Sequence, residues 1–191
     1  YEVIVLDNLL RGNKLNKNSL NKCKFINADV RNSKKVDEII KGCNYVFHLA
    51  AFLGVDEVAK NPKETMEIES MGTYNIVNSS IKHGIEKIIY ISTSGVYGKS
   101  EFNKAVSEDF SVSPTSSYAI AKRFNEIYLQ SVFQKYNLDT FSLRYFNVYG
   151  PRQDNRMVIS RFMNQAMKNK IITVYGNGMQ TRDFTFINDT V

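Results

Sequence analysis

A tyrosine and a lysine stand four residues apart in "SSYAIAKRFNEIYLQ", as Tyr118 and Lys122. Residues at i and i+4 lie on one face of a helix, so these two side chains can meet. An ammonium beside a phenol favours the phenolate and lowers the tyrosine pKa from its usual value of about 10. A phenolate within reach of a substrate hydroxyl can act as a general base. Such a pair also arises by chance in many helices, so the neighbouring elements must show whether it is catalytic.

A run of hydroxyl side chains follows a strongly apolar stretch in "EKIIYISTSGVYG". Ser92, Thr93 and Ser94 end the predicted strand, where buried hydroxyls cost free energy unless they find partners. One of them could hydrogen-bond a substrate oxygen as that oxygen gains or loses a proton. The alternative is a Ser/Thr turn that only satisfies local backbone groups.

Carboxylates and small residues follow three other predicted strands. Asp7 ends "YEVIVLD" and Asp29 ends "KCKFINAD". At the end of the second strand of a nucleotide fold, a carboxylate accepts hydrogen bonds from ribose hydroxyls and favours NAD over NADP. A turn cap is the alternative for Asp7, while Asp29 could meet an adenine amino group. In "HLAA", Ala50 and Ala51 would let a flat cofactor approach the backbone, or only allow close strand–helix contact.

Predicted strands and helices alternate along the chain. Strands are expected within residues 1–9, 22–30, 44–51, 86–94, 139–150, 171–176 and 181–187, and helices within 36–43, 62–83, 117–136 and 158–169. The strands are near-continuously apolar, which predicts a parallel sheet covered on both faces in a doubly wound α/β domain. In the helix over 117–136 the expected buried side holds Ile120, Phe124, Ile127, Leu129, Val132 and Phe133. Beyond residue 150 the pattern is less regular, as in a second, smaller lobe.

The overall composition excludes several classes of protein. Lys and Arg outnumber Asp and Glu by 25 to 19, and the excess is spread along the chain. A nucleic-acid binder more often has a clustered basic stripe, so we expect no nucleic-acid partner and favour a small anionic ligand. The two cysteines, Cys23 and Cys43, and the two histidines have no metal-ligand spacing, so we expect no metal site. No run of about 18 apolar residues is present, so we expect no membrane partner and a cytoplasmic location with reduced thiols.

Taken in order, the motifs resemble the extended short-chain dehydrogenase/reductase family, in particular its NAD-dependent nucleotide-sugar epimerases and dehydratases. The motifs are "VLDNL", "ADV", "HLAA", "GTYNIV", "ISTSGVYG", "SSYAIAK", "LRYFNVYGPRQ" and "VYGNGMQTRDF". The resemblance extends over essentially all of the 191 residues. The resemblance implies a Rossmann-like NAD-binding domain over residues 1–150, incomplete at its N-terminus. Residues 151–191 would form part of a substrate-binding region with a returning strand.

The resemblance also assigns roles to individual residues. Tyr118 would be the catalytic base, Lys122 would adjust its pKa and bind ribose, and Thr93 would complete the catalytic set. The NAD site would be lined by Asp7, Asn8, Asp29, Val30, Leu49, Ala50, Ala51, Tyr118, Lys122 and Tyr145. A nucleotide-sugar substrate would contact Thr93, Ser94, Asn147, Tyr175 and Arg182, the last as a clamp on the pyrophosphate. Arg144, inside a strand, is expected to form a structural ion pair.

Three departures from the family pattern shape the functional prediction. The glycine-rich turn that binds the pyrophosphate is absent from the sequence, so we expect a fragment of a longer protein that binds NAD poorly alone. Ser94 and Gly95 stand where dehydratases carry Asp-Glu, so elimination would lack its acid and base. Glu69 stands where the family usually has asparagine, and we leave it out of the predicted site.

These features favour NAD-dependent C4 epimerisation of a UDP-sugar through a 4-keto intermediate. The alternatives are a nucleotide-sugar dehydratase, decarboxylase or reductase of the same family, or a non-catalytic NAD-binding regulator on the same scaffold. Related enzymes commonly pair through two long helices per subunit, so we expect a homodimer formed through residues 62–83 and 117–136.

Overall fold

The computed structural model describes residues 1–98 and 105–191, which form two compact units. The first unit comprises Tyr1–Arg144 and the second Tyr145–Val191. The division falls a few residues before the boundary at residue 150 that the sequence pattern suggests. Each unit is described by itself below.

The first unit alternates strands and helices along the chain. Its strands are β1 (Ile4–Asp7), β2 (Lys24–Asn27), β3 (Tyr45–His48), β4 (Lys87–Thr93) and β5 (Asp139–Tyr145), the last of which reaches the start of the second unit. Its helices are α1 (Lys17–Leu20), α2 (Ser33–Ile40), α3 (Val55–Lys60), α4 (Pro62–Met66), α5 (Gly72–His83) and α6 (Ser117–Tyr136), with a π-helical segment η1 (Glu67–Met71) and a 3₁₀ turn η2 (Ser94–Tyr97).

The strands of this unit form two separate sheets. β1 and β2 pair in parallel, with Asp7 beside Asn27. The second sheet has the order β3-β4-β5, and β3 and β4 are parallel, with His48 beside Tyr90. The loops that follow β3 and β4 therefore begin at the same sheet edge. Parallel strands joined through helices confirm the predicted Rossmann-like α/β fold.

One face of the three-stranded sheet carries the core. Every second residue of β4 is buried, namely Ile88, Tyr90 and Ser92. Phe47 of β3 and Phe141 of β5 are more than half exposed. The helices of the first unit leave these two apolar side chains open.

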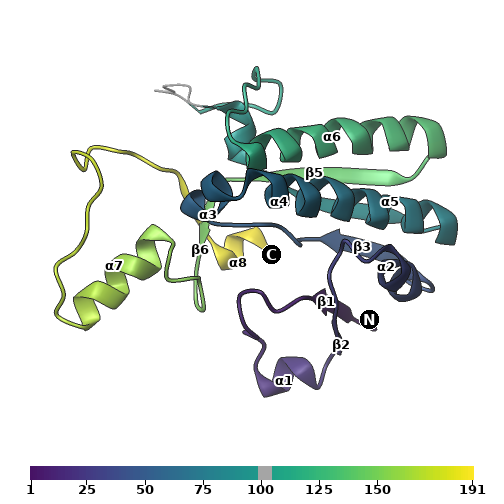
Figure 1. Ribbon diagram of the computed structural model, residues 1–191, viewed down its shortest axis with the longest axis horizontal. Helices are drawn as coiled ribbons and strands as arrows, with labels where there is room; N and C mark the ends of the chain where they lie inside the picture. Colours follow the sequence, from purple (N-terminus) through teal and green to yellow (C-terminus); the bar gives the residue numbers. More distant parts are fainter. Residues whose placement is uncertain (99–104) are drawn as a thin grey trace. The chain divides into compact units, whose positions relative to one another are not determined.

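The helices over residues 62–83 and 117–136 are confirmed, and Figure 1 shows α6 running alongside α4 and α5. Ser116 caps the start of α6 and Asn137 ends it in the left-handed conformation. Leu129 and Val132 are buried as predicted. Four other side chains predicted on the buried side are instead largely exposed, and these are Ile120, Phe124, Ile127 and Phe133. Helical periodicity alone does not distinguish a core stripe from an apolar surface stripe.

A π-helical segment interrupts the long helix before α5. In η1 the backbone hydrogen bonds join residues five apart instead of four, which widens the helix. Such segments are rare and often found at functional sites. It places the Glu69 side chain in the interior, where 1% of it is exposed. Gly72, the first residue after η1, allows α5 to approach the loop after β2, because an added Cβ would lie 2.6 Å from Val30 Cγ2.

The second unit contains β6 (Asn147–Tyr149), α7 (Val158–Met167), β7 (Phe184–Phe186) and α8 (Ile187–Thr190). β6 and β7 are parallel, with Asn147 beside Phe184. The strand predicted over 139–150 is interrupted at Phe146, and the strand predicted over 171–176 does not form. There the Gln165 side chain bonds the backbone N–H and the hydroxyl of Thr173, so these groups join no ladder.

Within the described part of the chain, no helix combines the length and the apolar character that crossing a bilayer requires.

Candidate active site

Tyr118 and Lys122 lie on one face at the start of α6, as their spacing predicts. The Ser116 hydroxyl accepts a hydrogen bond from the Ala119 N–H at 3.1 Å and fixes the first turn. The Lys122 ammonium lies 5.5 Å from the centre of the Tyr118 ring. Tyr118 is half-buried, so its ring packs on the core while part of it remains accessible.

The Lys122 ammonium is enclosed by groups from several elements. It donates a hydrogen bond to the Ile91 carbonyl at 2.8 Å and lies 4.7 Å from the centre of the Tyr90 ring. The Glu69 Oε2 atom lies 3.1 Å from it, and each side chain of this pair is 1% exposed. The other oxygen, Glu69 Oε1, accepts a hydrogen bond from the Phe52 N–H at 2.8 Å. Lys122 thus faces a buried carboxylate that sequence reasoning excluded from the site.

The Tyr118 pKa differs in direction from the one predicted. Lys122 was expected to lower it, but burial of the ring raises the pKa of Tyr118, and the negative charge of Glu69 adds to the rise. Burial lowers the pKa of Lys122, which Glu69 partly restores. Burial of the ring is the main reason for this difference, because it disfavours the charged phenolate. Glu69 adds to it, since a carboxylate beside the ammonium offsets the charge that would otherwise favour the phenolate.

The hydroxyls at the end of β4 have separate tasks. Ser92 is buried and donates a hydrogen bond to Glu126 Oε1 at 2.6 Å, so it is structural. Thr93 Oγ1 accepts from the Gly95 N–H at 3.1 Å and remains half-buried, as does Ser94. A Cβ added at Gly95 would lie 3.4 Å from Thr93 Oγ1 and 3.5 Å from Ala119 Cβ. The loop carrying Thr93 therefore lies against the first turn of α6, next to Tyr118.

Arg144 forms the structural ion pair that the sequence predicts. Its guanidinium donates to both Glu126 oxygens at 2.9 Å, in the bidentate arrangement that suits a carboxylate. It also bonds the Tyr97 hydroxyl and the Glu108 carbonyl. Arg144 thereby joins β5 to α6 and to the segment after η2.

The loops after β1 and β2 bring three of the predicted NAD residues together. The Asn8 amide donates to Asp29 Oδ2 at 3.1 Å, and Asp7 Oδ1 accepts from the Leu9 N–H. Arg31 also binds the Asp29 carboxylate through its backbone N–H and its guanidinium. These bonds lower the Asp29 pKa to about 2 and occupy both of its oxygens. An adenine amino group at Asp29 would therefore have to share or replace one of them.

The loop that follows Asp29 is fixed from α5. Asn75 donates to the carbonyls of Val30 and Arg31 at 3.0 and 3.1 Å. After β3, Ala50 and Ala51 are half-buried while Leu49 is exposed. The small side chains of Ala50 and Ala51 would let a flat ligand approach the backbone at this sheet edge.

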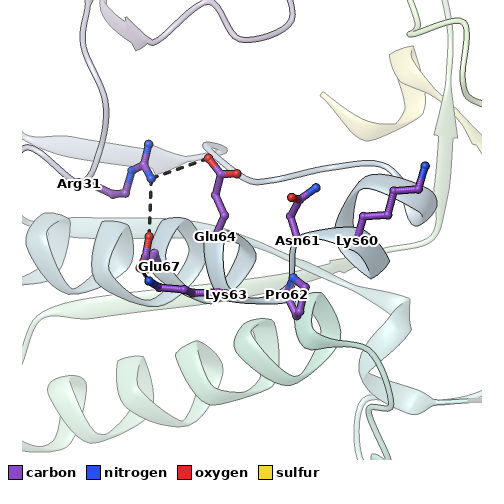
Figure 2. Close-up of a pocket in the computed structure, with 7 residues that line it drawn as sticks. All are labelled: Arg31, Lys60, Asn61, Pro62, Lys63, Glu64 and Glu67. Carbon is purple, nitrogen blue, oxygen red and sulfur yellow. Dashed lines mark ion pairs between the residues drawn. The ribbon is translucent and has the colours of Figure 1, made fainter.

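A surface hollow of about 350 Å³ lies beside this loop, and Figure 2 shows Arg31 pointing toward Glu64 and Glu67 across it. Both carboxylates lie 3.9 Å from the Arg31 guanidinium. The hollow contains none of the predicted site residues, and the contacts of Arg31 to Asp29, Glu64 and Glu67 indicate a structural role for it.

The second unit holds the remaining predicted residues. The Asn147 amide donates to the Asp183 carbonyl at 3.0 Å, so the β6–β7 pairing brings Asn147 near the segment that carries Arg182. Tyr175 is exposed, and its hydroxyl accepts a hydrogen bond from Arg161 at 2.9 Å. Arg182 is exposed and bonds the Thr181 carbonyl, while Tyr145 is half-buried at the end of β5.

The first unit fits a dinucleotide in part. It supplies an exposed carboxylate at Asp7, small residues after β3, and a phenol with a lysine where parallel strands end, which is where such folds bind nucleotides. It supplies no glycine-rich turn for the pyrophosphate, since the sequence contains none.

Comparison with known proteins agrees with this fit. A curated Methanocaldococcus jannaschii protein, provisionally named a UDP-glucose 4-epimerase, is 40% identical over 195 residues, which cover 99% of this chain and 63% of that protein. The UDP-N-acetyl-alpha-D-glucosaminuronate decarboxylase of Bacillus cytotoxicus is 34% identical over 199 residues, covering 100% and 61%. The crystal structure of the Thermotoga maritima UDP-glucose 4-epimerase with UDP-glucose matches with a TM-score of 0.93 at 32% identity, covering 100% and 63%.

The chain spans less than two thirds of the length of these relatives. The model of the NAD dependent epimerase/dehydratase family matches residues 1–191, the whole of the chain. The chain therefore belongs to the NAD-dependent epimerase/dehydratase family.

Proposed function

We propose that the protein is an NAD-dependent 4-epimerase of a UDP-sugar. The observation that carries this proposal is the Lys122 ammonium 5.5 Å from the centre of the Tyr118 ring, at the start of α6 and beside the loop of Thr93. A phenol and a hydroxyl at one point can remove and return the proton of a single sugar hydroxyl. The names of the M. jannaschii and T. maritima relatives favour UDP-glucose or a close analogue.

NAD, the cofactor of the family, supplies reversible hydride transfer when bound. In this proposal Asp7 and Asn8 hold the adenosine ribose, Asp29 and Val30 line the adenine side, and Lys122 holds the second ribose. Leu49, Ala50, Ala51 and Tyr145 line the remaining surface. Residues 1–150 are the NAD-binding domain in this proposal.

Tyr118 is the proposed base that takes the proton of the sugar C4 hydroxyl. With the C4 hydride passing to bound NAD, the substrate would become a 4-keto sugar that can turn over before hydride and proton return to it. Thr93 and Ser94 hydrogen-bond the sugar. Asn147, Tyr175 and Arg182, from the partial substrate-binding region over 151–191, contact the nucleotide diphosphate. The proximity of Asn147 to the segment before β7 supports a shared role for Asn147 and Arg182.

A second candidate is decarboxylation or dehydration of a nucleotide sugar, because the B. cytotoxicus relative is named a decarboxylase. Against dehydration, Ser94 and Gly95 stand where elimination needs an acid and a base. A reductase of the same family is a further alternative. A non-catalytic NAD-binding regulator is disfavoured, because Thr93, Tyr118 and Lys122 are all retained in the sequence.

An apolar surface on α5 and α6 supports a homodimer. A hollow of about 210 Å³ there is lined by Ser70, Met71, Tyr74, Phe124 and Tyr128. The Tyr128 ring stacks with the rings of Tyr74 and Phe124, each at 6.4 Å between ring centres. A patch of this kind on a folded protein commonly marks an interface. We further propose a cytoplasmic location, which the free thiols of Cys23 and Cys43 favour.

The test is to incubate the full-length protein with NAD and, separately, UDP-glucose, UDP-N-acetylglucosamine and UDP-glucuronate, and to separate the products by chromatography. We expect one substrate to be converted to its C4 epimer without loss of mass. Release of carbon dioxide or water would move the assignment to the second candidate, and no product with any of the three would contradict the proposal.

A further inference from the structure

The pair formed by Glu69 and Lys122 is unusual among the ion pairs of the described residues. Both side chains are 1% exposed, whereas every other recorded pair has at least one member that is 16% exposed or more. Burying two charges costs more free energy than a surface pair recovers, unless geometry and hydrogen bonds are complete. Here the Lys122 ammonium, 3.1 Å away, is the one partner of Glu69 Oε2 among the described residues. The pair is therefore a weak source of stability.

Several contacts hold Glu69 in this position. Its backbone carbonyl accepts hydrogen bonds from Thr73 Oγ1 at 2.7 Å and from the Asn125 amide at 3.0 Å. The Phe52 N–H fixes Oε1 and links Glu69 to the loop after β3. The π-helical segment lets the side chain turn inward toward α6. Contacts from α5, from α6 and from the loop after β3 thus hold a carboxylate next to Lys122.

The charged groups around Tyr118 can be followed element by element. Lys122 lies on its own helix, Glu69 on η1, Tyr90 on β4 and His48 on β3. Burial raises the pKa of Tyr90 and lowers that of His48 to about 3, so both are neutral near pH 7. Glu126, one turn further along α6, is bound by Arg144 and Arg123. Among these groups, Glu69 and Lys122 supply the charge that Tyr118 experiences.

We propose that Glu69 is a positioning residue that acts as the counter-ion of Lys122 and sets the pH at which Tyr118 becomes a base. With Glu69 ionised, the ammonium is already neutralised and gains little from a phenolate. Without that carboxylate, the phenolate becomes the counter-ion of a buried ammonium, so ionisation of Tyr118 is favoured. This inference rests on the proposed role of Tyr118 and deepens it.

The test compares the pH dependence of kcat/KM for wild-type full-length protein and Glu69→Gln, with NAD and UDP-glucose or whichever sugar proves active. An opposite charge within about 4–6 Å shifts a pKa by about one to three units. We therefore expect the acid limb of the Glu69→Gln profile, the pH range in which kcat/KM rises as Tyr118 loses its proton, to move down by about one unit or more. Glu67→Gln is the matched control, because Glu67 lies on the same segment but faces Arg31 and Lys63 at the surface. Its acid limb should stay in place.

Glu69→Asp keeps the charge and is the second variant in case Glu69→Gln does not fold. Its acid limb should remain within about half a unit of wild type. An acid limb that stays or rises in Glu69→Gln, that falls equally in Glu67→Gln, or that falls by a unit or more in Glu69→Asp would overturn the proposal.

A readout without turnover separates this proposal from the epimerase assignment. The phenolate absorbance of Tyr118 is obtained by subtracting the ultraviolet pH titration of Tyr118→Phe from that of wild type, and likewise in the Glu69→Gln background. We expect the difference signal to appear at lower pH in that background. If the phenolate signal of Tyr118 shifts to lower pH in a protein with no epimerase activity, the proposed function fails while the role of Glu69 stands. An unchanged signal in an active enzyme would reject Glu69 alone.

Discussion

Two carboxylates, Glu126 of α6 and Glu69 of η1, bind their cations in different ways. Glu126 is satisfied on both oxygens: Oε1 accepts from Ser92 and Arg144, and Oε2 from Arg123 and Arg144, at 2.6 to 2.9 Å. Glu69 has one backbone donor on Oε1 and only the nearby Lys122 ammonium beside Oε2. The Glu126 carboxylate thus accepts four hydrogen bonds, whereas the Glu69 carboxylate has two contacts, one to the Phe52 N–H and one to the Lys122 ammonium.

The pKa directions of the two carboxylates differ accordingly. Hydrogen bonds from Arg144, Ser92 and Arg123 overcome the effect of burial and lower the pKa of Glu126. Burial dominates at Glu69 and raises its pKa. A network with every partner in place stabilises the fold, whereas an incompletely satisfied buried pair is more readily explained by chemistry. We therefore assign Glu126–Arg144 to structure and Glu69–Lys122 to function, and each variant below tests that division.

The largest expected effect is on catalysis. Lys122→Met fills a similar volume but removes the ammonium that lies against the Tyr118 ring and that, in the proposal, holds the NAD ribose. We expect kcat/KM to fall by about 100-fold or more, the usual range for losing assisted proton transfer. The measurement is a steady-state epimerase assay, with far-ultraviolet circular dichroism as the folding control. A folded variant with more than a tenth of wild-type activity would remove Lys122 from the mechanism.

Arg144→Leu should reduce stability instead. It leaves Glu126 with Ser92 and Arg123 only. Because the pair is partly exposed and Glu126 keeps these two partners, we expect a loss below the roughly 3 kcal/mol for breaking a fully buried pair. Urea unfolding monitored by circular dichroism measures this loss. Arg144→Lys is the matched control, because it keeps the charge without the planar fork and should lose less. If Arg144→Leu unfolds at the wild-type urea midpoint, the pair is not structural.

The pH dependence of stability should expose the lowered pKa of Glu126. A carboxylate whose folded pKa lies below its ordinary value of 4.5 adds stability that is complete above that value and is lost as the pH falls through the folded pKa. The stability difference between wild type and Glu126→Gln should therefore be largest near pH 7 and shrink below about pH 4.5. Urea midpoints at several pH values test this, and a difference that grows toward low pH would reverse the sign.

The smallest effect is expected at an exposed pair. Lys35 and Glu38 lie one turn apart on α2 at 2.8 Å, and both are largely in solvent. Lys35→Ala should change the free energy of unfolding by no more than about 0.5 kcal/mol, because surface pairs contribute little. A loss as large as that of Arg144→Leu would show that burial does not separate these classes of pair.

The sequence predicts local features of this molecule well. The limits of α6 are marked by a capping serine and by Asn137 at its end, and the i, i+4 spacing places Tyr118 and Lys122 on one face. The structural role of Arg144 is confirmed because a charged residue inside a strand needs a partner.

Features that depend on distant contacts could not be predicted. The burial of Glu69 requires a π-helical segment and a lysine 53 positions further along the chain. The exposed ring of Phe124 follows the same periodicity as a core side chain, so the sequence does not indicate which face of α6 is covered. Residues 171–176 have strand-like composition, but the Gln165 side chain holds Thr173 outside any ladder.

The central claim is that the Tyr118 phenol exchanges the proton of the sugar hydroxyl. The most direct measurement is the rate of C4 epimerisation by full-length Tyr118→Phe, together with its affinity for NAD by isothermal titration calorimetry. The account predicts NAD affinity within about threefold of wild type and a fall in kcat of about 100-fold or more. Unchanged turnover in a variant that lacks this hydroxyl would contradict it.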